Sequence, residues 1–160
     1  MNQTKIPAVK AVRDLFGDLI GLDVSVSPGE PVALGQDSTG IATVYVTEQL
    51  AVSAVALLDL ALTAYLGSAL GLLPPAGVQD LLAEGEVSKS ALENVEEVLN
   101  IVSALFNVQG APHVKLYSVI LPGDLPPADI SEVLHSWGRR LDLTVNVPGY
   151  GSGAFSLALA

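Results

Sequence analysis

Three polar side chains recur near the middle of the chain at intervals that place them on one face of a helix. Glu93, Glu97 and Asn100 follow one another by four and three residues, the spacing at which helical side chains are neighbours. Two like charges four residues apart destabilise an isolated helix slightly. A basic group on a partner would relieve that repulsion, so the pattern indicates a surface that faces another molecule.

Asn100 is the least expected of the three residues, because it interrupts an apolar run over residues 98–102. Asparagine is a weak helix former, since its side chain competes for backbone hydrogen bonds, and Ala or Leu would serve the helix better. Simpler interpretations remain open for each residue. Glu93 can be a helix cap, Glu97 a solvated charge, and Asn100 an ordinary residue on the solvent-exposed side of the helix.

The helix that should carry these residues is clearly marked in the sequence. Ser90 and Glu93 match the capping-box pattern of a helix start, and the helix is expected to run to about Asn107, before Gly110 and Pro112. A core-facing apolar stripe at helical spacing supports this prediction. The stripe consists of Leu92, Val95, Leu99, Val102 and Phe106.

Hydrophobic periodicity and turn residues predict the remaining elements. Further helices are expected at Pro7 to Gly21, from a Thr47 cap to about Leu66 with Gly67 as the stop, at Val78 to Ala83, and as a short helix within Pro126 to Trp137. Strands are expected at Asp23 to Ser27, Pro31 to Leu34, Ile41 to Val46, His113 to Leu121, Leu141 to Val147 and Ala154 to Leu159. Hairpins separated by long helices predict an α+β fold, with an antiparallel sheet and long helices packed on one face, in a single domain over residues 1–160.

The net charge of the chain limits the kinds of partner that are expected. The chain has 160 residues with 17 acidic and 7 basic side chains, a formal charge of -10. This field repels phosphate backbones and anionic lipid, so no nucleic acid and no membrane is expected as a partner. Many acids lie between Asp80 and Glu97, Glu96 among them, and they form either a surface that attracts a basic partner or a merely solvated face.

Several other chemistries have little support in the sequence. Without cysteine there are no disulfides and no thiolate metal sites. His113 and His135 lie far apart without ligand-spaced carboxylates, so no metal site is expected. The glycines of residues 149–153 precede a strand rather than a helix, which favours a hairpin over a phosphate loop. The N-terminus lacks a signal-peptide pattern, and we expect a cytoplasmic protein.

The run from Leu50 to Leu73 is long enough to cross a bilayer and contains one charge, Asp59. Burying that charge in a membrane would cost roughly 2.5 to 3.5 kcal/mol, and Gly67 and Gly71 interrupt the second half. A helix that is apolar on nearly all sides is equally suited to a globular core or a subunit interface. The soluble interpretation is therefore favoured.

The segment from Glu97 to Asn100 resembles the Glu-x-x-Asn signature of the CheX and CheC chemotaxis phosphatases. The strand at Ile41 to Glu48, followed by a long helix ending at Tyr65 to Gly67, is similar to the elements before the signature in CheX. The N-terminal helix, the strand near residues 113–121 and the closing strand pair also fall where that family has them. The likeness covers most of the chain in topology but few residues in identity.

This resemblance implies an enzyme that removes phosphate from the aspartate of a phosphorylated, CheY-like response regulator. Asn100 would orient the attacking water and Glu97 would pair with a regulator lysine, while Glu93 and Glu96 are predicted to contact the partner. No cofactor of its own is expected, because the Mg²⁺ would belong to the regulator. Phosphoryl transfer depends on positioning and charge stabilisation, so an amide that holds a water is sufficient.

Some residues depart from the family pattern. Glu93 stands where Asp or Ser is frequent, and Ala104 stands where Gly is frequent. The N-terminal helix lacks the second signature of CheC, which favours a CheX-like arrangement with one site. The segment from Asp124 to Arg140, with Trp137, does not match the family and could form an additional docking or dimer surface.

Two other functions stay open. The chain could be a non-catalytic module of the same fold that docks a response regulator or another signalling protein through its acidic helix. It could also be a structural protein in which the apolar helix at Leu50 to Leu66 forms a dimer seam. Exposed sheet edges and the high apolar content are compatible with a homodimer.

Overall fold

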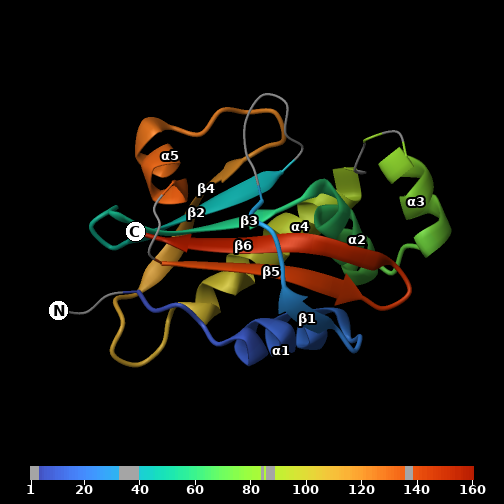
Figure 1. Cartoon of the computed structure of the whole chain (residues 1–160), viewed down its shortest axis with the longest axis horizontal. Coiled ribbons are helices and arrows are strands. Elements are labelled where there is room, and N and C mark those ends of the chain that lie inside the picture. The colour runs from blue at the N-terminus through green and yellow to red at the C-terminus, as the bar shows by residue number, and fades with distance from the viewer. Residues whose placement is uncertain (1–3, 33–39, 84, 86–88, 136–138) are drawn as a thin grey trace.

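The computed structural model describes residues 4–32, 40–83, 85, 89–135 and 139–160. In this part of the chain, six strands form one sheet in the order β1-β5-β6-β3-β2-β4, and every neighbouring pair is antiparallel (Figure 1). The strands are β1 Ser25–Pro28, β2 Ile41–Thr47, β3 Val52–Leu58, β4 Val114–Ile120, β5 Arg140–Val147 and β6 Gly151–Leu159.

Helices cover both faces of this sheet, but very unequally. The helices are α1 Val9–Ile20, α2 Leu60–Leu70, α3 Pro75–Ala83, α4 Lys89–Val102, the 3₁₀ turn η1 Ser103–Leu105 and α5 Ala128–Leu134. The larger core joins one sheet face to α1, α2 and α4, whereas the smaller core joins the other face to the short α5 through Ile130. The predicted α+β class, with the long helices on one face of an antiparallel sheet, is confirmed.

The sheet has an internal symmetry. If β1, β2 and β3 are exchanged with β4, β5 and β6, the strand order is the same when it is read from the opposite edge. Each half begins with a helix and continues with three strands, α1-β1-β2-β3 in the first half and α4-β4-β5-β6 in the second. The strands β3 and β6 pair at the centre, and β1 and β4 form the two edges. The helix α1 therefore has the same topological position as α4, although no repeat is visible in the sequence.

The segment that was expected to be one helix from Thr47 to Leu66 is a strand followed by a helix. Thr47 ends β2, and the turn after it leads into β3, which lies beside β2 in the sheet. Asp59 then caps α2, because its carboxylate accepts a hydrogen bond from the Leu62 amide at 2.8 Å. β3 is buried along almost its whole length, so it lacks the alternation of a half-exposed strand, and a short apolar run of this kind resembles a buried helix in sequence.

Three smaller expectations also need correction. The stop assigned to Gly67 is wrong, since α2 continues to Leu70. The capping box assigned to Ser90 and Glu93 is wrong, because α4 begins at Lys89 and Ser90 lies inside its first turn. β2 pairs with β3 and β4 rather than with a strand at residues 31–34. Pro31 and Val32 are outside any strand, and the rest of that prediction lies outside the described residues.

The apolar run from Leu50 to Leu73 is divided between β3 and α2. Among the described residues, no helix has both the length and the apolar character needed to cross a membrane. The interpretation of Leu50 to Leu66 as one helical dimer seam is therefore wrong, because β3 and most of α2 lie inside the fold.

Both sheet edges carry features that hinder pairing with another sheet. β1 has only four residues and ends at Pro28. β4 contains a bulge, since Val44 pairs with Ser118 and Tyr45 with Leu116, which leaves Tyr117 as the extra residue. Short strands, proline and bulges are typical ways to protect an edge. The homodimer stays a prediction.

Gly67 sets the distance between α2 and α4. A Cβ atom at this position would lie 2.1 Å from the backbone oxygen of Ala91 in α4, far inside van der Waals contact. The two helices therefore approach through their backbones, and only glycine allows this.

We expect Gly67→Ala to lower the free energy of unfolding by about 2 kcal/mol or more, because the added methyl group forces the two helices apart. The matched control is Gly77→Ala in α3, where a Cβ would meet nothing within 4 Å. That substitution should raise the free energy of unfolding by about 0.5 to 1 kcal/mol. Urea unfolding measures both values, and equal stability of Gly67→Ala and the wild type would contradict the close approach.

Candidate functional site

The helix α4 presents one polar face to solvent and one apolar face to the core. Glu93, Glu97 and Asn100 are exposed, and Glu96 beside them is half-buried. The opposite face is buried through Ala91, Val95, Val98, Leu99 and Val102. The structure thus brings together the three residues that the sequence places on one face, while their roles remain predictions.

Contacts with both the sheet and α2 hold α4 in place. The Asn94 side-chain amide donates a hydrogen bond to the Gly67 carbonyl at 3.0 Å. The Tyr45 hydroxyl donates to the Leu99 carbonyl, which ties the centre of α4 to β2. Sequence reasoning missed Asn94 and Tyr45, because the partner of each is distant in the chain and no local pattern marks it.

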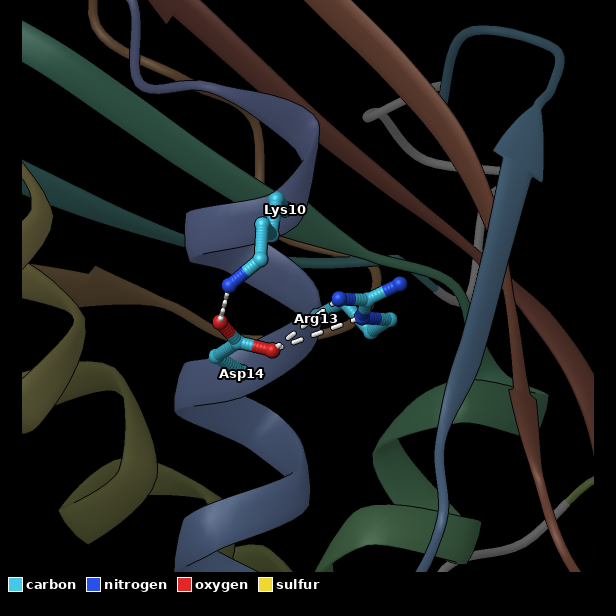
Figure 2. A network of polar contacts seen from close by, with 3 residues as sticks. All are labelled: Lys10, Arg13 and Asp14. Carbon is cyan, nitrogen blue, oxygen red and sulfur yellow. Dashed lines mark hydrogen bonds and ion pairs between the residues drawn. The ribbon is translucent and has the colours of Figure 1, made fainter.

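The carboxylates of α4 differ in their surroundings from Asp14 of the equivalent helix α1. Asp14 is paired with two cations of its own helix (Figure 2), since Lys10 Nζ lies 2.8 Å from Asp14 Oδ2 and Arg13 Nη2 lies 3.4 Å from Asp14 Oδ1. The hydrogen bond from Lys10 is the main reason that the pKa of Asp14 is lowered.

The carboxylates of α4 are not paired with cations in this way in the described part of the chain. In the described part of the chain, no lysine, arginine or histidine forms an ion pair with Glu93, Glu96 or Glu97. The Asn100 side-chain amide likewise has no hydrogen-bond partner among the described residues. The polar groups of this face are therefore available to an outside molecule.

One helical turn beyond Asn100, the surface becomes apolar. Ala104 lies at the wall of a groove of about 310 Å³, between the end of α4 and the segment that leads into α1. The groove is lined by Lys5, Ile6, Pro7, Ala8, Ala11, Ala104, Leu105 and Val108. A polar stripe on α4 thus continues into a mainly apolar depression.

The chemistry available on this surface is hydrogen bonding and charge pairing. An exposed amide one turn from an exposed carboxylate can orient a reactant that another molecule supplies. Among the described residues, no three His, Asp or Glu side chains converge to hold a metal ion. His135 instead makes a 2.6 Å contact between its Nδ1 and the Ser131 carbonyl of its own helix.

Comparison with known proteins supports the fold and leaves the activity open. No family model matches the sequence, and no curated protein matches it. Among solved structures, the CheX of a CheX-CheY-BeF3-Mg²⁺ complex from Borrelia burgdorferi is similar over 94% of both chains, with a TM-score of 0.56 and 8% identity. CheX from Vibrio vulnificus is similar over 95% of both chains, with a TM-score of 0.53 and 11% identity.

The FliM middle domain has the same architecture. The FliM middle domain from H. pylori is similar over 94% of this chain and 83% of its own, with a TM-score of 0.59 and 8% identity. The chain therefore has the fold shared by CheX, CheC-like and FliM middle-domain proteins. At these identities the likeness concerns the fold alone.

The exposed Asn100 should contribute nothing to stability, unlike a structural asparagine. We expect Asn100→Ala to raise the free energy of unfolding by about 0.5 kcal/mol, because alanine is the better helix former and no contact is lost. Asn107 is the matched control, since its amide bonds to both the N–H and the C=O of Val114, at 2.8 and 2.9 Å. Asn107→Ala should lower the free energy of unfolding by about 2 kcal/mol. Thermal or urea unfolding compares the two, and a loss of stability in Asn100→Ala would mean that Asn100 has a structural role.

Proposed function

We propose that this protein is a phosphatase that acts on the phospho-aspartate of a CheY-like response regulator. The observation that carries the proposal is the pair Glu97 and Asn100, whose side chains are exposed and without partners in the described chain, at Glu-x-x-Asn spacing on α4. The fold adds support, because a CheX protein of the same architecture was solved in complex with CheY.

In the proposed reaction, the side-chain amide of Asn100 holds a water molecule in line with the bond between phosphorus and the aspartate oxygen. The water oxygen forms a bond to phosphorus while the bond to the aspartate oxygen breaks. The products are the free aspartate carboxylate and inorganic phosphate, which takes the oxygen and both protons of the water. The regulator supplies the phosphoryl group and holds the Mg²⁺, so this protein contributes position and hydrogen bonding.

Charge directs the docking. Glu97 pairs with a lysine of the regulator next to the phosphoryl group, and Glu93 and Glu96 extend the acidic surface toward the start of α4. Because no cation in the described part of the chain is paired with these carboxylates, a basic partner gains their full attraction. Relief of the repulsion between Glu93 and Glu97 adds to the binding energy.

A non-catalytic docking module is the second candidate, and the likeness to FliM favours it. An H. pylori FliM of the same fold was solved in complex with FliG, with a TM-score of 0.59. In this case α4 would hold a response regulator or another signalling protein through its carboxylates, and Asn100 would have no part in a reaction.

Loss of phosphate from a phosphorylated regulator distinguishes the two functions. We expect the wild-type protein to accelerate this loss, and Asn100→Ala to reduce the acceleration about 100-fold, as removal of one essential hydrogen-bonding group in a reaction does. Asn146→Ala is the control, because Asn146 is an exposed asparagine on β5. Release of phosphate from several regulators is the measurement. Equal rates for wild type and Asn100→Ala would exclude catalysis by this residue.

Binding should depend on Glu97 and on salt in both candidate functions. Glu97→Lys is expected to weaken regulator binding by about 1 kcal/mol or more, and the wild-type affinity should fall as salt screens the charges. Glu48→Lys changes the net charge equally at the exposed turn between β2 and β3, and serves as the control. Titration calorimetry at low and high salt gives both affinities. If Glu48→Lys weakens binding as much as Glu97→Lys, the net charge matters and the α4 face does not.

A further inference from the structure

The carbonyl groups around Asn100 receive hydrogen bonds from two side chains. α4 ends at Val102 and passes into η1 at Ser103, so Asn100 lies in the last turn of the helix, where backbone carbonyls begin to lose their regular partners. The Tyr45 hydroxyl donates to the Leu99 carbonyl. The Ser103 hydroxyl donates to the Asn100 carbonyl at 2.9 Å.

These two bonds hold the two peptide groups that flank the Asn100 α-carbon. The peptide between Leu99 and Asn100 is fixed from the sheet, and the peptide after Asn100 is fixed from η1. Since the two peptide planes define φ and ψ at Asn100, they also define the direction of its Cα–Cβ bond. The exposed side chain has no other anchor among the described residues.

Tyr45 is itself held in place by burial, ring packing and a hydrogen bond. It is completely buried on β2, and its ring packs against Phe106 with 5.4 Å between centroids. The Thr43 hydroxyl donates to the Tyr45 oxygen at 3.0 Å. Burial raises the pKa of Tyr45, which keeps the hydroxyl protonated as a donor. β2 is itself held between β3 and β4.

We propose that Tyr45 and Ser103 are positioning residues, which aim the Asn100 side chain by holding the peptide groups on either side of it. This inference rests on the proposed function, in which Asn100 orients the attacking water. Small displacements of a reacting group reduce rates strongly, up to about 100-fold for 1 Å. Loss of either hydrogen bond should therefore slow the reaction without changing the docking surface.

Tyr45→Phe tests this inference, because it removes the hydroxyl and keeps the ring against Phe106. We expect the dephosphorylation rate at saturating regulator to fall by roughly 10-fold, within the range for a misplaced reacting group, while the half-saturating regulator concentration stays unchanged. Ser103→Ala should act in the same direction. Tyr150→Phe is the matched control, because the Tyr150 hydroxyl also donates to a backbone carbonyl, that of Leu73. It should leave the rate unchanged even if it lowers the melting temperature.

A double variant separates a positioning role of Tyr45 from a general destabilisation of the protein. If Tyr45 acts through Asn100, the double variant Tyr45→Phe/Asn100→Ala should be no slower than Asn100→Ala alone. Equal rates for Tyr45→Phe and wild type, or rate losses of the two substitutions that multiply in the double variant, would overturn the inference.

A second readout keeps the inference separate from the proposed function. In the NMR spectrum, Tyr45→Phe should shift the backbone and side-chain amide signals of Asn100, and Tyr150→Phe should not. If the wild-type protein has no activity on any regulator, the proposed function fails, but this measurement still decides whether Tyr45 holds Asn100. Unchanged Asn100 signals in Tyr45→Phe would overturn the positioning role.

Discussion

The close approach of α2 and α4 at Gly67 is the constraint on which the candidate site depends. With the backbone of α4 directly against α2, the helix cannot rotate about its axis without a clash between main-chain atoms. The Asn94 side chain adds a hydrogen bond to the Gly67 carbonyl across the same contact, and a Cβ at Gly71 would lie only 2.7 Å from the Asn94 amide. Because α4 also packs against the sheet core, the orientation that exposes Glu97 and Asn100 is fixed by packing on the other side of the helix.

The two halves of the fold use equivalent helices in different ways. Both α1 and α4 begin a unit of one helix and three strands, and both bury an apolar face on the same side of the sheet. On α1 the half-buried Asp14 is paired with Lys10 and Arg13, so this acid is compensated within its own helix. On α4 none of the acids Glu93, Glu96 and Glu97 has such a partner in the described chain, and the energetic gain from pairing is left to an outside molecule. The two equivalent helices thus differ in how far their own cations pair with their acids.

Much of the fold could be predicted from the sequence, for reasons that differ between elements. α4 and α1 are amphipathic, so their period identifies both the helix and its exposed face. The closing hairpin of β5 and β6 was also expected, because β5 alternates and glycines mark the turn after it. β3 was missed because both of its faces are buried, which removes the alternation that identifies a strand. Gly67 was interpreted as a helix stop, since a glycine near a helix end has that meaning locally and its contact with Ala91 is visible only in three dimensions.

The same distinction applies to the candidate site. Glu93, Glu97 and Asn100 were found because they lie on one face of one helix, where spacing alone brings side chains together. Tyr45 and Asn94 were not found, because they act across 54 and 27 residues of sequence. The residues that present the site are therefore buried or half-buried and fixed by packing and hydrogen bonds, whereas the residues proposed to act are exposed and their side chains make no contact that the fold requires. An asparagine at position 100 has no structural advantage over alanine there, and two neighbouring carboxylates four residues apart are slightly unfavourable. A helix selected for stability alone would have neither feature, which is the physical reason for the proposal that this face serves recognition and chemistry.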